Sequence, residues 1–468
     1  MNNEVETTVI SELQRTFASG RTRSLKWRRQ QLNAVHRMLI SHRKEWEQAL
    51  RADLGKSSFD TWTTEISQVA AEISHTRKHL KKWLRHDSAR TPLSLQPGKS
   101  HIRHEPLGTV LIIAPWNYPL QLLLSPLVGA IAGGNCVVLK PSEVSRNVEQ
   151  LFARLVPRYL DRSAIRVAVG GPETVNALID SRPDKVFFTG STAVGTLIAE
   201  RCAGQLIPSV LELGGKSPVY VHRDTNLKKA ARHIVWGKFM NAGQTCVAPD
   251  HVYVHRAVAN RFARAVAREI RSQFGRNPRK SKDFGRIITV RHAERLAKMI
   301  TRNEVYHGGE TDPQSRFIAP TVLFPVTETH PSMKEEIFGP VLPILPVSGP
   351  KEAVERINSR EKPLALYVFA KSKKTQRLVL AEAQSGGTAI NTTLMHLSTP
   401  YLPFGGVGHS GWGNYHGDWS FSAFTHERAV FTKATCFDTV KLIKPPASPV
   451  VKTVVQKTLL PAGKKRRR

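Results

Sequence analysis

Cysteine is scarce in this chain of 468 residues. The four cysteines, Cys136, Cys202, Cys246 and Cys436, are far apart, and no two of them form a C-x-x-C pair. This spacing argues against a zinc site built from thiolates and against a framework of disulfides. We therefore expect no metal site, and we expect a reducing compartment such as the cytoplasm.

Acidic residues are also few relative to basic ones. The chain has 37 Asp and Glu residues against 69 Lys and Arg residues, which gives a formal net charge of +32. Such an excess attracts nucleic acid, phosphorylated cofactors or an acidic membrane surface, although it also serves solubility alone. Because the chain has no zinc-finger pattern and no aromatic RNA-binding motif, recognition of a particular nucleotide sequence is disfavoured.

The chain contains no uninterrupted apolar run that is long enough to cross a membrane. Its most apolar window, residues 107–139, is broken by Pro115, Pro119, Pro126 and the pair Gly133-Gly134. A spanning helix tolerates few such residues, so we expect this window to form a buried strand, a turn and a buried helix. The first residues are acidic and polar, unlike a secretory signal. A cytoplasmic location, with peripheral binding at a membrane surface as an option, fits these observations.

Residues 1 to about 90 show a helical pattern. Apolar side chains recur at helical spacing on one face, with Arg and Lys opposite: Leu32, Val35, Leu39, Trp46 and Leu50. A second helix is expected over residues 64–84. Residues 87–104 contain Pro92, Pro97 and Gly98, and they are expected to form an extended hairpin.

Short apolar runs then alternate with helical stretches. Strands are expected at 109–114, 136–140, 165–169, 185–189 and 209–213, and helices at about 119–132, 145–160, 172–180 and 192–203. This alternation predicts an α/β fold with a doubly wound parallel sheet, in which ligands bind beyond the carboxyl ends of the strands. Asn117, Lys140, Glu143, Gly190 and Glu212 all fall at or just after those ends.

A second α/β block follows this one. We expect helices at about 227–240 and 260–274, and strands at 251–255, 318–322, 341–346, 364–370 and 387–390. The glycine-rich and aromatic stretch 402–413 predicts a tightly turned loop. The last residues, from 441 on, are rich in proline and end in a run of cations, which predicts a disordered basic tail.

Cys246 is the last residue of the stretch Gly243-Gln244-Thr245-Cys246, in a turn that follows an amphipathic helix. A thiol there can attack a carbonyl carbon, although a cysteine taken at random is more often a small buried apolar residue. The resulting oxyanion needs donors, for which the Asn117 amide and the Cys246 N–H are candidates. Glu212, at a strand end, is a candidate base for activating water. Taken singly, Asn117 is also compatible with a turn cap and Glu212 with a solvated carboxylate.

The stretch Gly190-Ser191-Thr192-Ala193-Val194-Gly195 follows an expected strand and opens a helix, as a diphosphate-binding turn does. It lacks the G-x-G-x-x-G fingerprint, so a capped strand-to-helix turn is an equal interpretation. Lys140 and Glu143 belong to the stretch KPSE at a strand end. Their side chains could bind the hydroxyls of a ribose, or they could form an exposed cap at that strand end.

Together these stretches resemble the aldehyde dehydrogenase superfamily. The ordered set PWNYP, KPSE, FFTGSTAVG, LELGGKSP, GQTCVAPD, EEIFGPVLP and LPFGGVGHSG carries the resemblance, which extends from about Phe17 to about His426. The motifs FFTGSTAVG and GQTCVAPD and the C-terminal motif Tyr415-His416-Gly417 resemble those of the class 3 branch, which acts on fatty and aromatic aldehydes.

The resemblance implies three parts and a basic tail. An NAD(P)-binding domain would comprise residues 1–86 and 105–212, and a catalytic domain would comprise residues 213–390. An oligomerisation arm would combine residues 87–104 and 391–430, and the tail would be residues 441–468.

The resemblance also implies residue roles. Cys246 would be the nucleophile, Glu212 the general base and Asn117 the oxyanion donor. Residues implied to bind NAD, with NADP as an option, are Lys140 and Glu143 at the adenosine ribose, Gly190 and Ser191 at the diphosphate, Glu336 and Phe338 at the nicotinamide ribose, and Trp116. Tyr118 and Phe404 would line the substrate pocket.

The implied activity is oxidation of a medium- or long-chain aliphatic or an aromatic aldehyde through a thiohemiacetal and a thioester. The class resemblance suggests a homodimer, and the positive charge suggests weak association with anionic membrane or nucleic acid. One alternative is a CoA-acylating enzyme, which Glu212 disfavours because a base that activates water would waste the thioester. Another is a non-catalytic binder of anions on the same scaffold.

Overall fold

The computed structural model describes residues 3–435, 438, 440 and 444–459, and these form two units. The larger unit comprises the described residues up to Trp83 together with Glu105–His426. The smaller unit comprises Leu84–His104 and the described residues from Glu427 on. Residues 391–426, which the sequence analysis assigned to the arm, therefore lie within the larger unit.

Helices occupy the first part of the larger unit, as predicted. They are α1 (Asn3–Ala18), α2 (Leu25–Ser41), α3 (Arg43–Leu54), α4 (Ser58–Thr61), the π-helical turn η1 (Trp62–Ile66) and α5 (Ser67–Trp83). The Ser24 hydroxyl accepts a hydrogen bond from the Trp27 N–H and caps α2. The five apolar residues that predicted a single face, from Leu32 to Leu50, are all fully buried.

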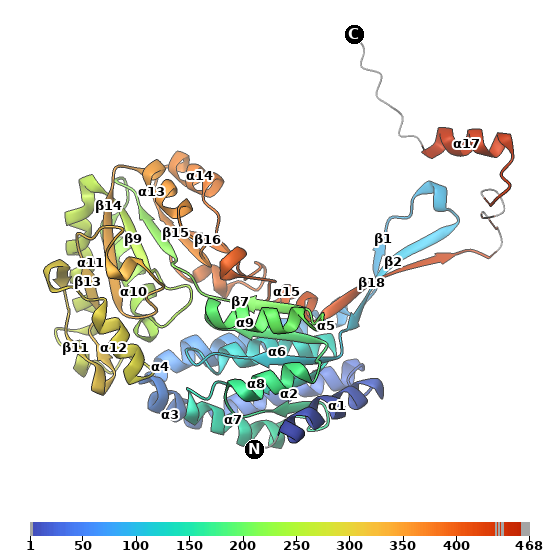
Figure 1. Ribbon diagram of the computed structural model, residues 1–468, viewed down its shortest axis with the longest axis horizontal. Coiled ribbons are helices and arrows are strands. Elements are labelled where there is room, and N and C mark those ends of the chain that lie inside the picture. Colours follow the sequence, from blue (N-terminus) through green and yellow to red (C-terminus); the bar gives the residue numbers. More distant parts are fainter. Residues whose placement is uncertain (1–2, 436–437, 439, 441–443, 460–468) are drawn as a thin grey trace, which may run out of the picture. The chain divides into compact units, whose positions relative to one another are not determined.

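The first sheet has six strands in the order β17-β7-β6-β3-β4-β5, of which β7 is labelled in Figure 1. The five predicted strands form its parallel part: β3 (Thr109–Ile113), β4 (Cys136–Lys140), β5 (Ile165–Val167), β6 (Lys185–Thr189) and β7 (Ser209–Glu212). The sixth, β17 (Gly411–Trp412), joins from the far end of the chain and runs antiparallel to β7, with Gly411 opposite Glu212. The sequence analysis placed these two residues in a loop.

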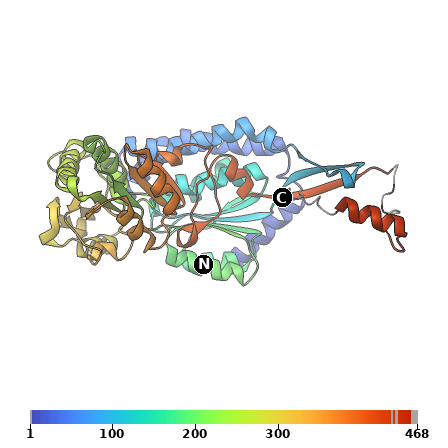
Figure 2. The same ribbon diagram turned by 90° about the horizontal axis from the view of Figure 1, so that it is seen from above.

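Helices cover both faces of the first sheet (Figure 2). The connecting helices are α6 (Gln121–Gly133), α7 (Arg146–Tyr159), α8 (Pro172–Asp180) and α9 (Thr192–Ala203), and α15 (Asp418–Ala423) packs on α6. Every residue of β3 and of β4 is buried, and so is α6 from Leu122 on, so the apolar window at 107–139 is core as predicted. Among the described residues, no helix combines the length and the apolar character that crossing a bilayer requires.

The second sheet has seven strands in the order β10-β13-β14-β9-β8-β15-β16. They are β8 (Pro218–Val221), β9 (His251–His255), β10 (Val305–His307), β13 (Thr321–Leu323), β14 (Val341–Val347), β15 (Ala365–Phe369) and β16 (Gly387–Ile390). Its helices are α10 (Leu227–Phe239), α11 (Ala259–Phe274), α12 (Val290–Lys298), α13 (Pro350–Asn358) and α14 (Lys373–Glu382). A separate pair, β11 (Thr311–Asp312) and β12 (Phe317–Ile318), lies beside α12.

The second sheet and its helices differ from the prediction in several features, and strand β10 and helices α12, α13 and α14 were not predicted. The sequence analysis missed β8, a four-residue strand between β9 and β15 that begins at Pro218, where a missing N–H is tolerated. The single strand predicted at 318–322 is divided between β12 and β13, because Pro320 has no N–H to continue a ladder.

The smaller unit contains the predicted hairpin. Strands β1 (Asp87–Ala89) and β2 (Gly98–Pro106) pair antiparallel, with Asp87 opposite Ile102, and β18 (Thr425–Lys433) lies on the other side of β2. Helix α17 (Pro449–Leu459) forms in the segment predicted to be disordered, because Pro449 opens a valine-rich stretch at helical spacing. Cys436 and residues 460–468 lie outside the described residues.

Candidate active site

Cys246 lies in a compressed loop between α10 and β9. Three consecutive residues of this loop, Asn241, Ala242 and Gly243, have left-handed φ values of 50°, 52° and 75°. A side chain at Gly243 would place its Cβ 2.3 Å from the Gly339 carbonyl oxygen, so only glycine fits there. The loop holds Cys246 partly exposed as a free thiol, just before β9, the central strand of the second sheet.

The turn after β3 reaches across to this loop. The Asn117 side chain donates from Nδ2 to the Gln244 carbonyl at 3.1 Å, and Asn241 Nδ2 donates to the Asn117 carbonyl at 2.8 Å. Tyr118 is buried and shares a 2.6 Å hydrogen bond between its hydroxyl and that of Thr245. Asn117 and Tyr118, both predicted site residues, therefore lie next to the segment that ends in Cys246.

Glu212 ends β7 and is 2% exposed. Neither of its carboxylate oxygens has a hydrogen-bond partner among the described residues. Burial raises the pKa of Glu212 well above its usual value, because no cation compensates for the lost hydration. A buried carboxylate without partners is costly, and such a group is well suited to taking up a proton.

The charges of the site act on the Cys246 thiol. Burial, together with the nearby carboxylates of Glu336 and Glu212, raises the pKa of Cys246 to about 12. Burial and repulsion from Asp250 raise the pKa of Glu336 to about 8. The structure therefore brings Cys246, Glu212 and Glu336 together, although they come from three separate stretches of the sequence.

Glu336 is held against the glycine pair that follows Glu212. A Cβ on Gly214 would lie 2.3 Å from a Glu336 carboxylate oxygen, so the side chain lies directly on that backbone. The neighbouring Ile337 N–H donates to Asp250 Oδ2 at 2.9 Å, and Asp250 is paired with Lys216 at 2.5 Å. This buried pair fixes the loop that carries Glu336.

The rings of Phe338 and Trp116, both predicted to bind the cofactor, lie against each other. Phe338 has a left-handed φ of 47°, and its ring meets that of Trp116 edge to face at 5.4 Å. On its other side, Trp116 contacts the His292 ring at 5.3 Å.

The remaining predicted cofactor residues lie at strand ends of the first sheet. Lys140 Nζ donates to the Pro141 carbonyl at 2.5 Å and lies 3.3 Å from Glu143 Oε2. Ser191 caps the twelve-residue helix α9 by accepting from the Val194 N–H, and the Gly190 N–H donates to the Glu212 carbonyl at 3.0 Å. A capped helix N-terminus and a buried lysine, both at the carboxyl ends of strands in one sheet, suit a dinucleotide with a negative diphosphate.

Phe404 packs on two neighbouring aromatic residues. Its ring lies 5.6 Å from that of Tyr415 and stacks on that of His416 at 5.3 Å. After burial, the charges of Glu212 and Cys246 raise the pKa of Tyr415 further, which places Tyr415 near both groups. The predicted pocket residue Phe404 thus packs on a tyrosine that feels the charges of Glu212 and Cys246.

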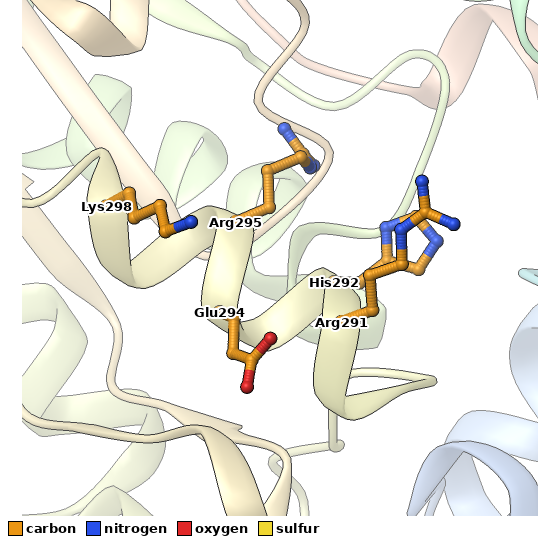
Figure 3. A pocket seen from close by; sticks show the side chains of 5 residues that line it. All are labelled: Arg291, His292, Glu294, Arg295 and Lys298. Atoms are coloured by element: carbon orange, nitrogen blue, oxygen red, sulfur yellow. The ribbon is translucent and has the colours of Figure 1, made fainter.

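The sequence analysis missed a cationic pocket on α12. Arg291, His292, Glu294, Arg295 and Lys298 line a hollow of about 510 Å³ (Figure 3). Arg295 donates to the Glu335 carboxylate at 2.9 Å and to the Ile337 carbonyl at 2.7 Å, so this pocket adjoins the Glu336 loop. A nine-residue helix rich in charged residues is typical of a solvated surface. No signal in the sequence distinguishes a helix that lines a pocket from an ordinary exposed helix. Among the described residues, no group of three or more His, Cys, Asp or Glu side chains is arranged to hold a metal ion.

Comparisons with known proteins agree with the predicted resemblance. Residues 3–430 match the model of the aldehyde dehydrogenase family. A relative from Rattus norvegicus, "Aldehyde dehydrogenase, dimeric NADP-preferring", is 43% identical over 440 residues, which cover 94% of this chain and 97% of that protein. "Aldehyde dehydrogenase family 3 member B1" from Homo sapiens is 43% identical over 441 residues, 94% of each chain.

A solved structure supports the same relationship. The substrate-bound state of AldH from Staphylococcus aureus superposes with a TM-score of 0.93 at 41% identity, covering 96% of this chain and 98% of that one. The predicted superfamily, its class 3 branch and the fold are confirmed by these matches.

Proposed function

This chain belongs to the aldehyde dehydrogenase family and is an NAD(P)-dependent aldehyde dehydrogenase, and we propose that Cys246, Glu212 and Asn117 are its catalytic residues. One observation carries the proposal. A thiol, an amide donor and a buried carboxylate without partners converge from two different sheets.

The first proposed step is attack by sulfur on the aldehyde. Because the pKa of Cys246 is raised to about 12, the resting thiol holds its proton at neutral pH. The thiol loses its proton to solvent as the S–C bond forms, and the carbonyl oxygen becomes an oxyanion, so Glu212 is still free to act as a base in the second step. The Asn117 amide has two hydrogens, so it is able to bond Gln244 with one and the oxyanion with the other.

The second proposed step is release of the acid. NAD(P)⁺, when bound, supplies the hydride acceptor that leaves a thioester on Cys246. Glu212 then accepts a proton from water, and the hydroxide attacks the thioester carbon. The C–S bond breaks, the sulfur regains a proton, and the carboxylate leaves. A base in this position favours hydrolysis over transfer to CoA.

The cofactor would be held by residues at the mouth of the first sheet. We propose that Lys140 and Glu143 bind the adenosine ribose and that Gly190, Ser191 and the start of α9 receive the diphosphate. Glu336, Phe338 and Trp116 would adjoin the nicotinamide ribose, with the α12 pocket beside them. The Glu143 carboxylate opposes a 2′-phosphate and Lys140 favours one, so we propose NAD as the cofactor with NADP also accepted.

The proposed substrates are medium- or long-chain aliphatic and aromatic aldehydes. The Tyr118 hydroxyl bonds Thr245 beside the thiol and Phe404 packs on Tyr415, and such aromatic residues suit an apolar tail. We also propose a homodimer, in line with the class resemblance, in a reducing cytoplasm. Cys136, Cys202 and Cys246 are free thiols, which fits that compartment.

Substitution of Glu212 by Gln tests the mechanism. We expect single-turnover NADH formation to persist, while steady-state turnover falls about 10²- to 10³-fold, because thioester hydrolysis loses its base. Stopped-flow absorbance with a panel of aldehydes and both cofactors measures these rates and the substrate class. A normal steady-state rate in this variant would contradict the role of Glu212.

A specific surface supports a second proposal, weak association with anionic membrane. On α11, Arg261, Arg264, Arg268 and Arg271 are exposed and share one face at helical spacing. On the neighbouring helix α10, the exposed residues are Lys228, Lys229, Arg232 and Trp236. The two faces are continuous, because Gln273 of α11 donates to the Arg232 carbonyl. Such a face attracts lipid phosphates, and an exposed Trp suits the headgroup region.

Replacing the four α11 arginines by Gln should weaken binding to phosphatidylserine-containing vesicles about a hundredfold at low salt. The control removes the same charge from the exposed face of α5, as Arg77→Gln, Lys78→Gln, Lys81→Gln and Lys82→Gln. Equal losses in both variants would leave net charge as the only cause. Binding to RNA but not to vesicles would instead favour a nucleic-acid partner.

A further inference from the structure

A buried ion pair lies behind the turn that carries Asn117. Lys56 Nζ is 2.5 Å from Glu65 Oε1, and both side chains are completely buried. Lys56 follows Gly55 at the end of α3, and Glu65 lies in the π-helical turn η1. Neither residue has a part in the chemistry proposed above, so the pair requires another explanation.

Lys56 holds the start of the Asn117 turn. Besides Glu65, its ammonium group donates to the Asn117 carbonyl at 3.1 Å. The same ammonium group lies 3.9 Å from the centre of the Tyr118 ring, within range of a cation–π interaction. One buried cation therefore contacts the backbone of Asn117 and the side chain of the next residue.

Glu65 holds the other end of the same segment. Its second oxygen, Oε2, accepts from the N–H groups of Leu120 at 3.2 Å and Gln121 at 2.9 Å. These groups belong to the first turn of α6, whose N-cap residue, Leu120, has no side chain that could bond them. The carboxylate thus caps α6 from a distant part of the chain, where negative charge is favoured.

The turn that carries Asn117 also contacts the loop that ends in Cys246. Asn117 Nδ2 donates to the Gln244 carbonyl and Tyr118 bonds Thr245, so both residues meet the segment just before Cys246. A shift of the turn would change the direction of the Asn117 amide relative to the thiol. We propose that Lys56 and Glu65 are positioning residues that aim this amide at the developing oxyanion. This proposal rests on the proposed role of Asn117.

The ionic character of the pair agrees with a role in geometry. Apolar residues of similar volume often replace a buried ion pair without loss of stability, whereas removal of one partner leaves an unpaired charge. Apolar residues, however, do not form directed hydrogen bonds to the backbone. Here the two side chains supply directed bonds to both ends of one five-residue segment.

The double variant Lys56→Met with Glu65→Leu separates positioning from stability. We expect it to fold with a Tm near that of the wild type, while single-turnover NADH formation slows about 10- to 100-fold. Alkylation of Cys246 by iodoacetamide needs no oxyanion donor, so its rate should stay within about twofold of the wild type. The single variant Glu65→Gln, which keeps the shape of the side chain, should slow the same step if the double variant does not fold.

Asp53→Ala provides a matched control. Asp53 is a buried carboxylate that caps α7 from a distant segment, through the Val148 N–H at 3.1 Å. Its loss should lower Tm without slowing the single turnover. A wild-type single-turnover rate in the double variant, or in Glu65→Gln, would overturn the positioning role. If Asn117→Ala also kept a wild-type rate, the role of Asn117 itself would fail, which is a separate result.

Discussion

The two sheets contribute to the site in different ways. The first sheet supplies side chains from the carboxyl ends of its parallel strands: Asn117 after β3, Lys140 at the end of β4, Gly190 after β6 and Glu212 at the end of β7. The second sheet supplies Cys246 from an irregular loop that precedes β9. Regular strand ends therefore position the polar side chains, and a constrained loop positions the proposed nucleophile.

The constrained loop depends on contacts from outside its own sheet. Non-glycine residues in the left-handed region cost on the order of 1 kcal/mol or more each, so Asn241 and Ala242 need external support. Asn117 of the first sheet and the Gly339 backbone supply contacts on two sides. Since the strand ends need no such support, variants in the two regions should behave differently.

The largest expected effect is in the loop. Cys246→Ala should reduce aldehyde oxidation by about 10⁴-fold or more, because no other described thiol is near the site. Steady-state NADH formation measures this loss. Cys202→Ala, which removes a buried thiol of α9, should keep activity within about twofold. If Cys246→Ala and Cys202→Ala lost similar activity, the thiol in the loop would have no special role in the reaction.

Two glycine substitutions compare the regions directly. Gly243→Ala forces a side chain into a left-handed position and against the Gly339 backbone, so it should cost about 2 kcal/mol or more in unfolding free energy. Gly190→Ala meets only the end of the Phe188 ring, which is able to move, so it should cost about 1 kcal/mol or less. Denaturant unfolding measures both. Equal costs would contradict the idea that the loop is the more constrained region.

The pH dependence of thiol alkylation sharpens the same contrast. With the pKa of Cys246 raised to about 12, the reactive thiolate is rare at pH 7 and increases about tenfold per pH unit. Iodoacetamide labelling of the cofactor-free enzyme should therefore keep accelerating up to pH 9 and beyond. In denaturant, where the thiol pKa returns to about 8.5, the rate should level off near pH 9. A plateau below pH 8 in the folded enzyme would be inconsistent with a thiol pKa that desolvation and the nearby carboxylates raise.

The smallest effect is expected at a strand end. Glu143→Gln removes a carboxylate that is about half exposed, so its charge is largely screened by solvent. We expect the ratio of kcat/KM for NADP to that for NAD to rise about two- to fivefold, since less negative charge opposes the 2′-phosphate. Assays with both cofactors measure this ratio, and a fall in it would place the 2′-phosphate away from Glu143.

Much of the first sheet could be predicted from the sequence. Its five parallel strands are short apolar runs bounded by turns, and the rule that ligands lie beyond the carboxyl ends selected Lys140, Gly190 and Glu212. Strand β17 was not predicted, because two residues are too few to show an alternation of apolar and polar side chains. Its pairing with β7 also joins residues that are far apart in the chain.

The second sheet and the support of the site were harder to predict. β8 is too short to show alternation, and α12 reads as a solvated surface. Lys56 and Glu65 gave no signal, because charged residues in a helical stretch are usually exposed and only the fold shows that these two are buried. The family resemblance predicts which groups react, whereas the residues that support them follow from three-dimensional packing.

The pairing of β17 with β7 also has a consequence for folding. Gly411 lies opposite Glu212, and the Leu213 N–H donates to the Ser410 carbonyl, so the strand that carries the proposed base is completed by residues far away in the sequence. Contacts of such long sequence separation form slowly, because the loop entropy is lost before the contact is made. During refolding, aldehyde oxidation should accordingly return only after this edge strand has paired.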